Sequence, residues 1–197
     1  VRTGDVMLDA ALTFKKIALS KSKIISDLNL DGQRYALCTI HRAENVDDIN
    51  VLDWICKGLN DLSKEVPIIL PLHPRTKSRL EKFSLLDLIS PLVRLIPPVG
   101  FLDILALQSL SSLIVTDSGG MQKEAFFQKK PCVTVRSETE WTELLEGGHN
   151  RLAKPLKDEI RDKAQLALNA NLDWSINLYG DGKSSETIAD SLLERTG

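Results

Sequence analysis

The stretch from Asp117 to Glu124 contains residue types and spacings that can bind phosphate. It follows an apolar, β-branched run and leads into a helix-like stretch, and this strand–turn–helix order points the free N–H groups of a helix's first turn at a ligand. The helix dipole adds roughly half a positive charge at that end. Gly119 and Gly120 lack a Cβ, so a diphosphate can approach the backbone closely. The alternative reading is a Ser118 N-cap followed by a glycine-rich turn with no ligand.

Two side chains of this stretch have polar atoms suited to a nucleotide. Ser118 can cap the helix or donate its hydroxyl to phosphate. Glu124 lies about one helical turn further along, where its carboxylate can accept hydrogen bonds from ribose hydroxyls.

Imidazole and cationic side chains follow other apolar runs and suit an anionic ligand. His41 is followed by Arg42, which places a tunable donor beside a planar, always-charged fork. His73 precedes a proline, which restricts it to an extended backbone, and Arg136 ends another apolar run. The structural alternative keeps His41 as a packing residue and pairs Arg42 with Glu44.

The apolar runs and helical periodicities that must position these residues alternate along the chain. Strands are expected at 35–40, 67–72, 93–96, 113–116 and 131–135. Helices are expected at 6–17, 46–64, 75–83, 103–110, 121–128, 140–146, 158–170 and 185–193. This alternation predicts an α/β fold with a Rossmann-like, doubly wound parallel sheet. Ligands bind such sheets beyond the carboxyl ends of the strands, so the polar stretches after four of these strands are predicted to form one site.

Other conspicuous side chains have structural readings. His149 lies beside polar residues and is expected at the loop surface, whereas Trp54 and Trp174 fit helix packing. Trp141 lies in a stretch that faces the expected site, where it can pack on a ligand or in the core.

Composition and charge exclude several classes of function. The 197 residues are 43% hydrophobic and 26% charged, as in soluble globular proteins. The formal net charge of −2 argues against a nucleic-acid-binding face, and no apolar run approaches the ~20 residues of a membrane span. Three scattered cysteines, Cys38, Cys56 and Cys132, are expected to be small buried side chains in a reducing compartment. No Cys/His spacing predicts a metal site.

The first residue is Val1 rather than Met, so we expect the chain to be a processed or excised piece of a longer protein. Charged residues near this end stand where a signal peptide would need its apolar core. A cytoplasmic location is therefore expected.

Motifs in a fixed order along nearly the whole chain resemble the C-terminal half of the non-hydrolysing UDP-N-acetylglucosamine 2-epimerases. HRAEN at 41–45 and DSGGMQ at 117–122 are highly specific together. Further matching stretches are TGD at 3–5 with Asp9, HPR at 73–75, GFLD at 100–103, Arg136 with Thr139 and Glu140, and YGDG at 179–182.

The resemblance implies the C-terminal domain of a GT-B-like two-domain fold, with the nucleotide sugar in the cleft between two Rossmann-like domains. Residues 1–25 would be a hinge helix from the end of the missing N-terminal domain, 26–175 the Rossmann-like UDP-binding domain, and 176–197 a C-terminal loop and closing helix. The expected partners are the UDP-sugar substrate, the N-terminal domain of the same protein and, in the full-length enzyme, a second copy in a homodimer. We do not expect the protein to bind nucleic acid, a membrane, a metal or a cofactor.

The reaction implied by the resemblance makes the full-length enzyme an isomerase, with a role in cell-surface polysaccharide biosynthesis. C2 of UDP-N-acetylglucosamine would be inverted by eliminating UDP to a 2-acetamidoglucal and re-adding it to the other face. His41 would be catalytic and assist the departure of UDP. The implied substrate-binding residues are Arg42, His73, Phe101, Ile104, Ser118, Gly119, Gly120, Glu124 and Arg136, with Phe101 and Ile104 bordering the uracil. The fragment alone is not expected to epimerise, because the acidic residues that handle the C2 proton in this family lie in the N-terminal half.

Several alternatives stay open. EWTE at 140–143 stands where the family usually has Glu-Arg-Pro-Glu, a pattern that leaves room for epimerases of other UDP-2-acetamido sugars, such as a diacetamido uronic acid. The donor-binding domain of a GT-B glycosyltransferase, a hydrolysing epimerase and a non-catalytic nucleotide-binding module are the other candidates.

Overall fold

Short apolar runs form the strands of one parallel sheet in the computed structural model, which describes residues 1–196. Within these residues the strands are β1 (Ala36–Thr39), β2 (Ile68–Pro71), β3 (Val93–Ile96), β4 (Leu113–Thr116), β5 (Cys132–Val135) and β6 (Asn150–Ala153). Their order is β3-β2-β1-β4-β5-β6, and every neighbouring pair is parallel. This is the Rossmann order, in which the strand order reverses between β1 and β4. The predicted doubly wound parallel sheet is confirmed.

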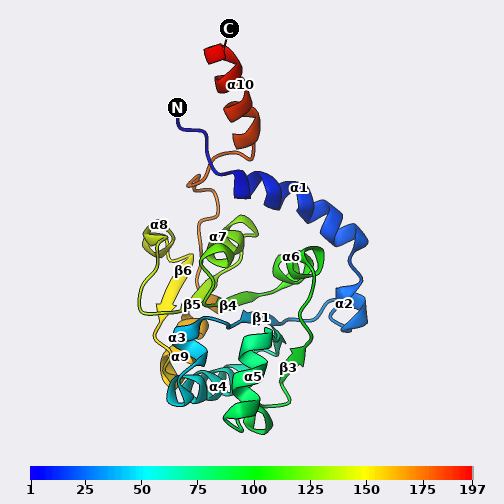
Figure 1. Cartoon of the computed structure of the whole chain (residues 1–197), viewed down its shortest axis with the longest axis vertical. Coiled ribbons are helices and arrows are strands. Elements are labelled where there is room, and N and C mark those ends of the chain that lie inside the picture. Colours follow the sequence, from blue (N-terminus) through cyan, green and yellow to red (C-terminus); the bar gives the residue numbers. More distant parts are fainter. Residues whose placement is uncertain (197) are drawn as a thin grey trace.

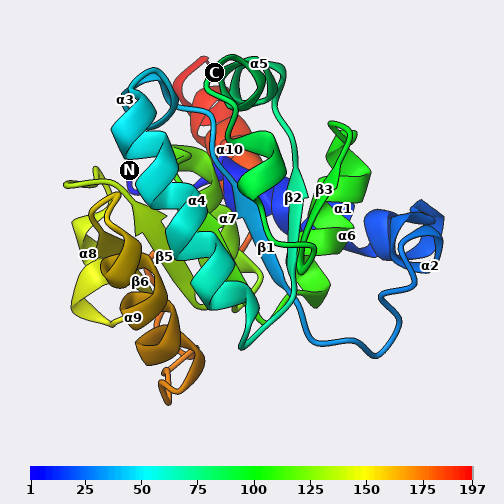
Figure 2. The ribbon, with the colours of Figure 1, turned by 90° about the horizontal axis from the view of Figure 1, so that it is seen from below.

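Helices cover both faces of the sheet (Figure 1). They are α1 (Val6–Lys21), α2 (Ile24–Asp27), α3 (Ala43–Val46), α4 (Ile49–Ser63), α5 (Pro74–Lys82), η1 (Leu86–Leu88), α6 (Phe101–Leu110), α7 (Gly119–Phe127), α8 (Thr142–Glu146), α9 (Lys157–Leu168) and α10 (Ser184–Thr196). The helices α1, α6 and α7 lie on one side of the sheet, while α4, α5 and α9 lie on the other, where α4 crosses the strands (Figure 2). Among the described helices, none has the length and apolar character needed to cross a membrane.

The helix expected at 46–64 is α4, at Ile49–Ser63, so its start was predicted too early. The reason is Asp48, whose side chain accepts hydrogen bonds from the N–H groups of Asn50 and Val51 and so starts α4 afresh. A side-chain acceptor of this kind satisfies N–H groups that a continuous helix would bond to its own carbonyls.

Both faces of the sheet are apolar, which explains the nearly continuous apolar strands. Ala36 and Cys38 face the larger core, under α4 and α9, whereas Tyr35 and Leu37 face the smaller core beside α6. The Tyr35 hydroxyl is satisfied there by donating to the Leu107 carbonyl oxygen at 2.7 Å. The three cysteines are free and buried, as predicted.

Strand β6 and the burial of His149 were missed by the sequence reading. The polar composition of β6 hid this strand. A polar strand is tolerated there because, among the described residues, β6 lies at the sheet edge beside β5, and its Asn150 amide is satisfied by Gln122 and Thr134. His149 is buried rather than at the loop surface: its ring lies 4.8 Å from the Trp174 ring, and Nε2 lies 2.8 Å from the Asp173 carbonyl oxygen.

Trp54 and Trp174, both predicted to pack from helices, lie in different kinds of segment. Trp174 is in a turn rather than a helix, so the helix-packing reading was wrong for it. Trp54 is on α4, with 42% of its surface exposed.

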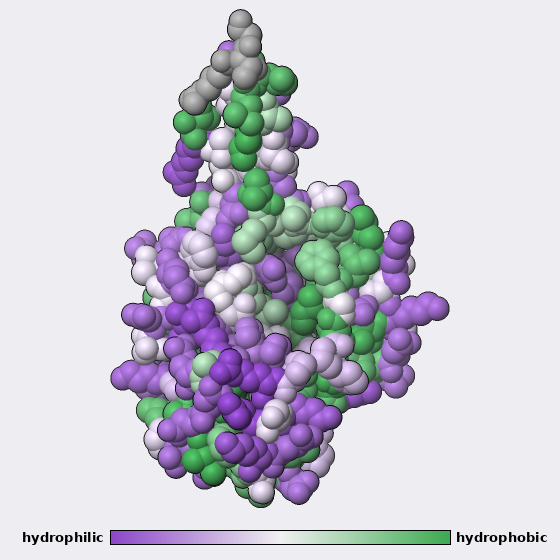
Figure 3. Space-filling model, viewed as in Figure 1, coloured by the Kyte–Doolittle hydropathy of each residue, from purple (hydrophilic) through white to green (hydrophobic). Residues whose placement is uncertain are grey.

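The first and last helices are tied to each other. Asp9 accepts hydrogen bonds from the N–H groups of Ser184 and Ser185, at the start of α10. Beyond this point α10 projects from the body of the molecule (Figure 1) and carries apolar surface (Figure 3). Exposed large apolar side chains on α1 and α10 include Leu12, Phe14, Leu19 and Ile188.

Candidate functional site

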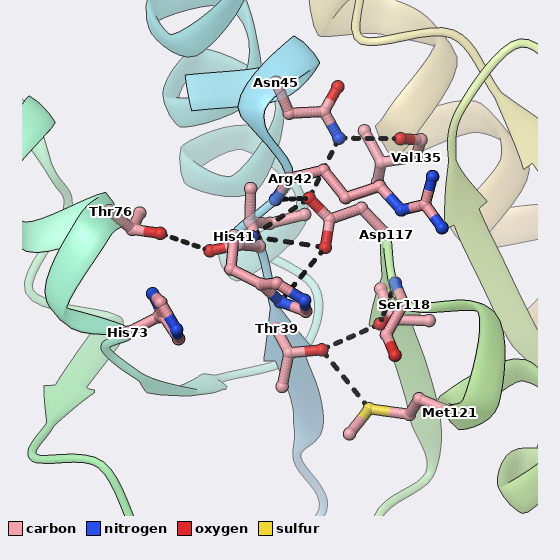
Figure 4. Close-up of polar contacts among 12 residues, drawn as sticks. Thr39, His41, Arg42, Asn45, His73, Thr76, Asp117, Ser118, Met121 and Val135 are labelled. Atoms are coloured by element: carbon pink, nitrogen blue, oxygen red, sulfur yellow. Dashed lines mark hydrogen bonds and ion pairs between the residues drawn. The ribbon is translucent and has the colours of Figure 1, made fainter. Parts of the chain in front are cut away.

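A buried carboxylate lies where the strand order reverses. Asp117, which follows β4, is fully buried and accepts hydrogen bonds from the backbone N–H groups of His41 and Arg42 at 3.0 and 2.9 Å (Figure 4). Asn45 donates a third hydrogen bond through Nδ2, at 3.0 Å. A buried charge needs such donors to offset its lost hydration. Asp117 therefore fixes the turn after β1 against the turn after β4.

Asn45 extends this connection to a third strand. Its Nδ2 also donates to the carbonyl oxygen of Val135, at the end of β5, at 2.9 Å. Sequence reasoning had Asp117 and Asn45 in its motifs but assigned neither a role. A carboxylate directly after a buried strand, with an amide in the turn after the adjacent strand, is the signal that could have found them.

The two histidines predicted for this edge come together. The ring centroids of His41 and His73 are 5.3 Å apart, and both residues line a hollow of about 180 Å³ with Ile104 and Ser118. His41 has 39% of its side chain exposed, and its Nδ1 is 3.4 Å from Asp117 Oδ1. Nδ1 of His73 accepts the N–H of Arg75 at 3.1 Å and so caps α5.

The predicted turn at 118–120 forms the start of α7. Ser118 is in the N-cap position, but its side chain makes no capping hydrogen bond, so the hydroxyl is available to a ligand. A Cβ built on Gly119 would come no closer than 3.7 Å to the side chains of Glu140 and Trp141. Because that is ordinary contact, the folded chain itself does not demand glycine there.

Arginines and glutamates alternate beside this turn. Arg136, whose side chain is only 8% exposed, donates from Nη1 to Glu140 Oε2 at 2.8 Å, and its Nε is 3.8 Å from Glu44. Arg42 is 3.8 Å from Glu44 and 4.0 Å from Glu140. The hydrogen bond from Arg136 lowers the pKa of Glu140 to about 2. Both arginines are therefore near the turn but already matched by carboxylates.

Trp141 packs on the first turn of α7. Its Nε1 donates to the Gly119 carbonyl oxygen at 2.9 Å, and the Lys123 ammonium lies 4.2 Å from the centre of its ring. Lys123 is buried and forms an ion pair with Asp5, which ties the N-terminal segment to α7. The sequence reading assigned no role to this ion pair.

Glu124 and Phe101 lie in a neighbouring hollow. They line about 190 Å³ of space together with Met7 and Leu105, between α1, α6 and α7. Glu124 accepts a hydrogen bond from Gln108 Nε2 at 2.6 Å. Phe101 and Ile104 stand three residues apart on α6, yet they line different hollows. Of the predicted site residues, His41, His73, Ile104 and Ser118 thus line one hollow, and Phe101 and Glu124 line the other.

Comparison with known proteins settles the family. A family model described as UDP-N-acetylglucosamine 2-epimerase matches residues 1–193. The chain belongs to this family. The resemblance drawn from the HRAEN and DSGGMQ stretches is confirmed.

Relatives of this epimerase-family chain include enzymes for two sugars. The UDP-2,3-diacetamido-2,3-dideoxy-D-glucuronate 2-epimerase of Pseudomonas aeruginosa is 44% identical over 196 residues, which are 98% of this chain and 52% of that protein. The UDP-N-acetylglucosamine 2-epimerase of Methanocaldococcus jannaschii is 38% identical over 191 residues, with 94% of this chain and 52% of that protein covered. The chain thus spans about half the length of the curated relatives it matches.

A solved structure has the same fold over nearly the whole chain. It is the Methanocaldococcus jannaschii UDP-GlcNAc 2-epimerase in complex with UDP-GlcNAc and UDP, with a TM-score of 0.88 and 38% identity. The match covers 98% of this chain and 54% of that one.

Proposed function

We propose that this chain is the UDP-binding half of an epimerase that inverts C2 of UDP-N-acetylglucosamine through elimination and re-addition of UDP. The observation that carries the proposal is the uncapped Ser118 at the start of α7, where the strand order reverses, in a chain of the epimerase family. This is where open α/β sheets bind their ligands. The complex of the Methanocaldococcus jannaschii relative with UDP-GlcNAc and UDP supports the same ligand class.

In this proposal the start of α7 holds the diphosphate. The N–H groups of Gly119 and Gly120 belong to the first turn of α7 and have no carbonyl partner within the helix. The Ser118 hydroxyl donates to a phosphate oxygen. His41 and His73 line the adjoining hollow, from which an imidazolium can donate to the same diphosphate.

The nucleoside extends into the hollow between α1, α6 and α7. There Glu124 accepts hydrogen bonds from the ribose hydroxyls and Phe101 borders the uracil, while Ile104 borders it from the adjoining hollow. Arg42 and Arg136 stay beside the diphosphate, and each exchanges part of its contact with Glu44 or Glu140 for phosphate.

The chemistry assigned to this half is stabilisation of the leaving group. When the bond between C1 and the phosphate oxygen breaks, its electron pair goes to that oxygen, and loss of the C2 proton forms the double bond of the glucal. Donors aimed at the oxygen that becomes negative lower the barrier, since they bind the transition state better than the ground state. His41 has this role, whereas proton transfer at C2 belongs to acidic residues of the other half, so the fragment alone does not epimerise.

Residues 1–25 and α10 are proposed to contact that other half. Both helices of this region keep apolar side chains exposed, and α10 projects from the body (Figure 3). In the full-length enzyme a homodimer is proposed as well.

A second substrate is favoured by one specific observation. The 44% identity with the Pseudomonas aeruginosa enzyme exceeds the 38% identity with the Methanocaldococcus jannaschii one. A UDP-diacetamido uronic acid is therefore the alternative substrate of the same site.

Ligand binding is tested first on the 197-residue chain by NMR titration with UDP, pyrophosphate and uridine. UDP should shift the amide signals of Ser118, Gly119 and Gly120 with weak affinity, because half of the cleft is missing. No UDP-dependent change near Ser118 at millimolar ligand would contradict the proposal.

The reaction is then tested with the other half supplied and each UDP-sugar offered without an acceptor. Inversion at C2 identifies an epimerase, and the sugar with the higher kcat/KM identifies the substrate. Net release of free UDP would instead indicate a hydrolysing epimerase, and turnover only with an acceptor a glycosyltransferase.

A further inference from the structure

The Asp117 carboxylate also faces the imidazole of His41. His41 Nδ1 is 3.4 Å from Oδ1, an ion-pair distance. The same carboxylate accepts hydrogen bonds from the backbone N–H groups of His41 and Arg42 (Figure 4). A carboxylate in this position acts as an acceptor only. A hydrogen on the imidazole nitrogen that faces it is therefore favoured, because a lone pair there would be repelled by the carboxylate.

Asn45 prevents the carboxylate from turning away. Its Nδ2 donates both to Asp117 and to the carbonyl oxygen of Val135. Since that carbonyl can only accept, the amide nitrogen and not the amide oxygen must point at Asp117. The carboxylate is thus held from three directions, and its fourth neighbour is the His41 ring.

The other two histidines of the chain have the opposite arrangement. Nδ1 of His73 accepts the N–H of Arg75, so its hydrogen is on Nε2 when the ring is neutral. Nε2 of His149 faces the Asp173 carbonyl oxygen and carries its hydrogen there. Only His41 among the three histidines has its Nδ1 against a carboxylate.

We propose that Asp117 is a positioning residue for His41: it holds the hydrogen on Nδ1 and thereby presents Nε2 to the hollow beside Ser118. The consequence for catalysis rests on the proposed function. When His41 is protonated, Nε2–H donates to the phosphate oxygen that gains charge, and Asp117 offsets the imidazolium charge without taking a proton. The same arrangement of carboxylate and imidazole orients the histidine of hydrolase triads.

The proposal is tested on the 197-residue chain with ¹⁵N-labelled histidine, since the sequence has only three histidines. Long-range ¹H–¹⁵N spectra at about pH 8.5, where an unperturbed imidazole is neutral, report which nitrogen carries the hydrogen. His41 should have the Nδ1–H form, and His73 and His149 the Nε2–H form as internal references. An Nε2–H form of His41 in the wild-type chain overturns the proposal, and this measurement needs no variant to fold.

Asp117→Asn tests whether the carboxylate determines which nitrogen of His41 carries the hydrogen. The new amide must use its oxygen for the backbone N–H groups, which turns its NH₂ toward the ring, so His41 should lose the Nδ1–H signature and switch to Nε2–H. Asn45→Ala is the control, because it removes one donor but keeps the carboxylate, and His41 should then stay in the Nδ1–H form. A switch of equal size in the control would show that loosening of the turn, not the carboxylate, sets the ring, and would overturn the proposal.

A UDP titration on the same samples separates this inference from the proposed function. If UDP shifts the His41 Nε2 signal but leaves that of His149 unchanged, the ring and the ligand meet as proposed. If UDP does not bind while His41 keeps the Nδ1–H form, the nucleotide site fails and the positioning role of Asp117 stands.

Discussion

At the scale of single residues, the site consists of side chains with unequal freedom. Asp117 and Asn45 are buried and hydrogen-bonded to each other, whereas the Ser118 hydroxyl makes no capping bond and His41 is partly exposed. The buried, hydrogen-bonded groups fix the positions of the turns, and the Ser118 hydroxyl and the His41 ring are the groups that a ligand can contact.

Glu124→Ala should weaken the binding of the nucleoside part of UDP but not that of the diphosphate. The carboxylate lies in the hollow between α1, α6 and α7, away from the turn at Ser118. Removal should weaken UDP binding by about 1.5–3 kcal/mol, the range for hydrogen bonds to a charged group, and leave pyrophosphate binding nearly unchanged. Calorimetric titration with both ligands measures this, and equal losses for both would refute the ribose assignment.

Glu140 should make the stability of the chain depend on acid pH. Its pKa is lowered from 4.5 to about 2 by the hydrogen bond from Arg136, so its contribution is present above pH 4.5 and is lost as the pH falls toward 2. The melting temperature of Glu140→Gln should lie slightly below that of wild type at pH 6, since the exposed carboxylate is screened. The melting temperatures of the two proteins should converge as the pH falls. A difference that widens below pH 4.5 would contradict the lowered pKa of Glu140.

At the scale of elements, the starts of two helices contrast. Asp48 caps α4 through its side chain, while Ser118 stands at the start of α7 without a side-chain bond. The start of α4 is thus satisfied within the chain, whereas the proposed function leaves the Ser118 hydroxyl to a ligand.

Asp48→Ala should therefore cost about 1 kcal/mol of unfolding free energy, whereas Ser118→Ala should leave stability almost unchanged. Ser118→Ala should instead weaken UDP binding by about 0.5–1.5 kcal/mol, a typical hydrogen bond. Urea unfolding and UDP titration of both variants measure the two quantities. Reversed effects, with Ser118→Ala less stable and normal in binding, would mean that the hydroxyl is structural.

The ion pair between Asp5 and Lys123 joins the N-terminal segment to α7. Asp5→Asn keeps an acceptor for the Met7 N–H but leaves the buried ammonium without its charge partner. The expected loss of unfolding free energy is about 1.5–3 kcal/mol. Lys123→Met removes the charge together with its need for a partner and should cost less, and a double-mutant cycle by urea unfolding checks that Asp5→Asn adds little on that background.

At the scale of the whole molecule, one Rossmann-like domain presents the candidate site at one edge of its sheet, and α10 extends away from the body. The chain spans about half the length of its relatives. The catalytic role proposed for His41 is therefore tested in a protein that also contains the proposed N-terminal half.

His41→Ala in the reconstituted two-domain protein should lower turnover far more than UDP affinity. A donor to a group that gains charge in the transition state is worth roughly 3–4 kcal/mol when removed. Melting temperature, UDP affinity and turnover are measured on the same variant. Turnover per folded molecule within about threefold of wild type, less than ~0.7 kcal/mol of barrier, would leave His41 without a catalytic role.

The sequence by itself determined the fold class, the family and the edge of the sheet at which the candidate site lies. The apolar run at 113–116 became β4 without change, because a strand buried along its whole length needs continuous apolar residues. The run at 93–96 became the edge strand β3, where Arg94 is exposed. The convergence of His41, His73 and Ser118 followed from parallel strands, whose carboxyl ends meet at one edge.

Only the tertiary structure decided what depends on contacts between distant segments. It revealed β6, whose Asn150 is polar but satisfied by Gln122, and it buried His149 against Trp174. It also showed that Asp117 connects the turns after β1 and β4, through hydrogen bonds from residues more than 70 positions away in the chain. Local pattern reports the average polarity of a segment, whereas the cost of burying one polar group is set by whichever neighbours the fold brings within hydrogen-bonding distance.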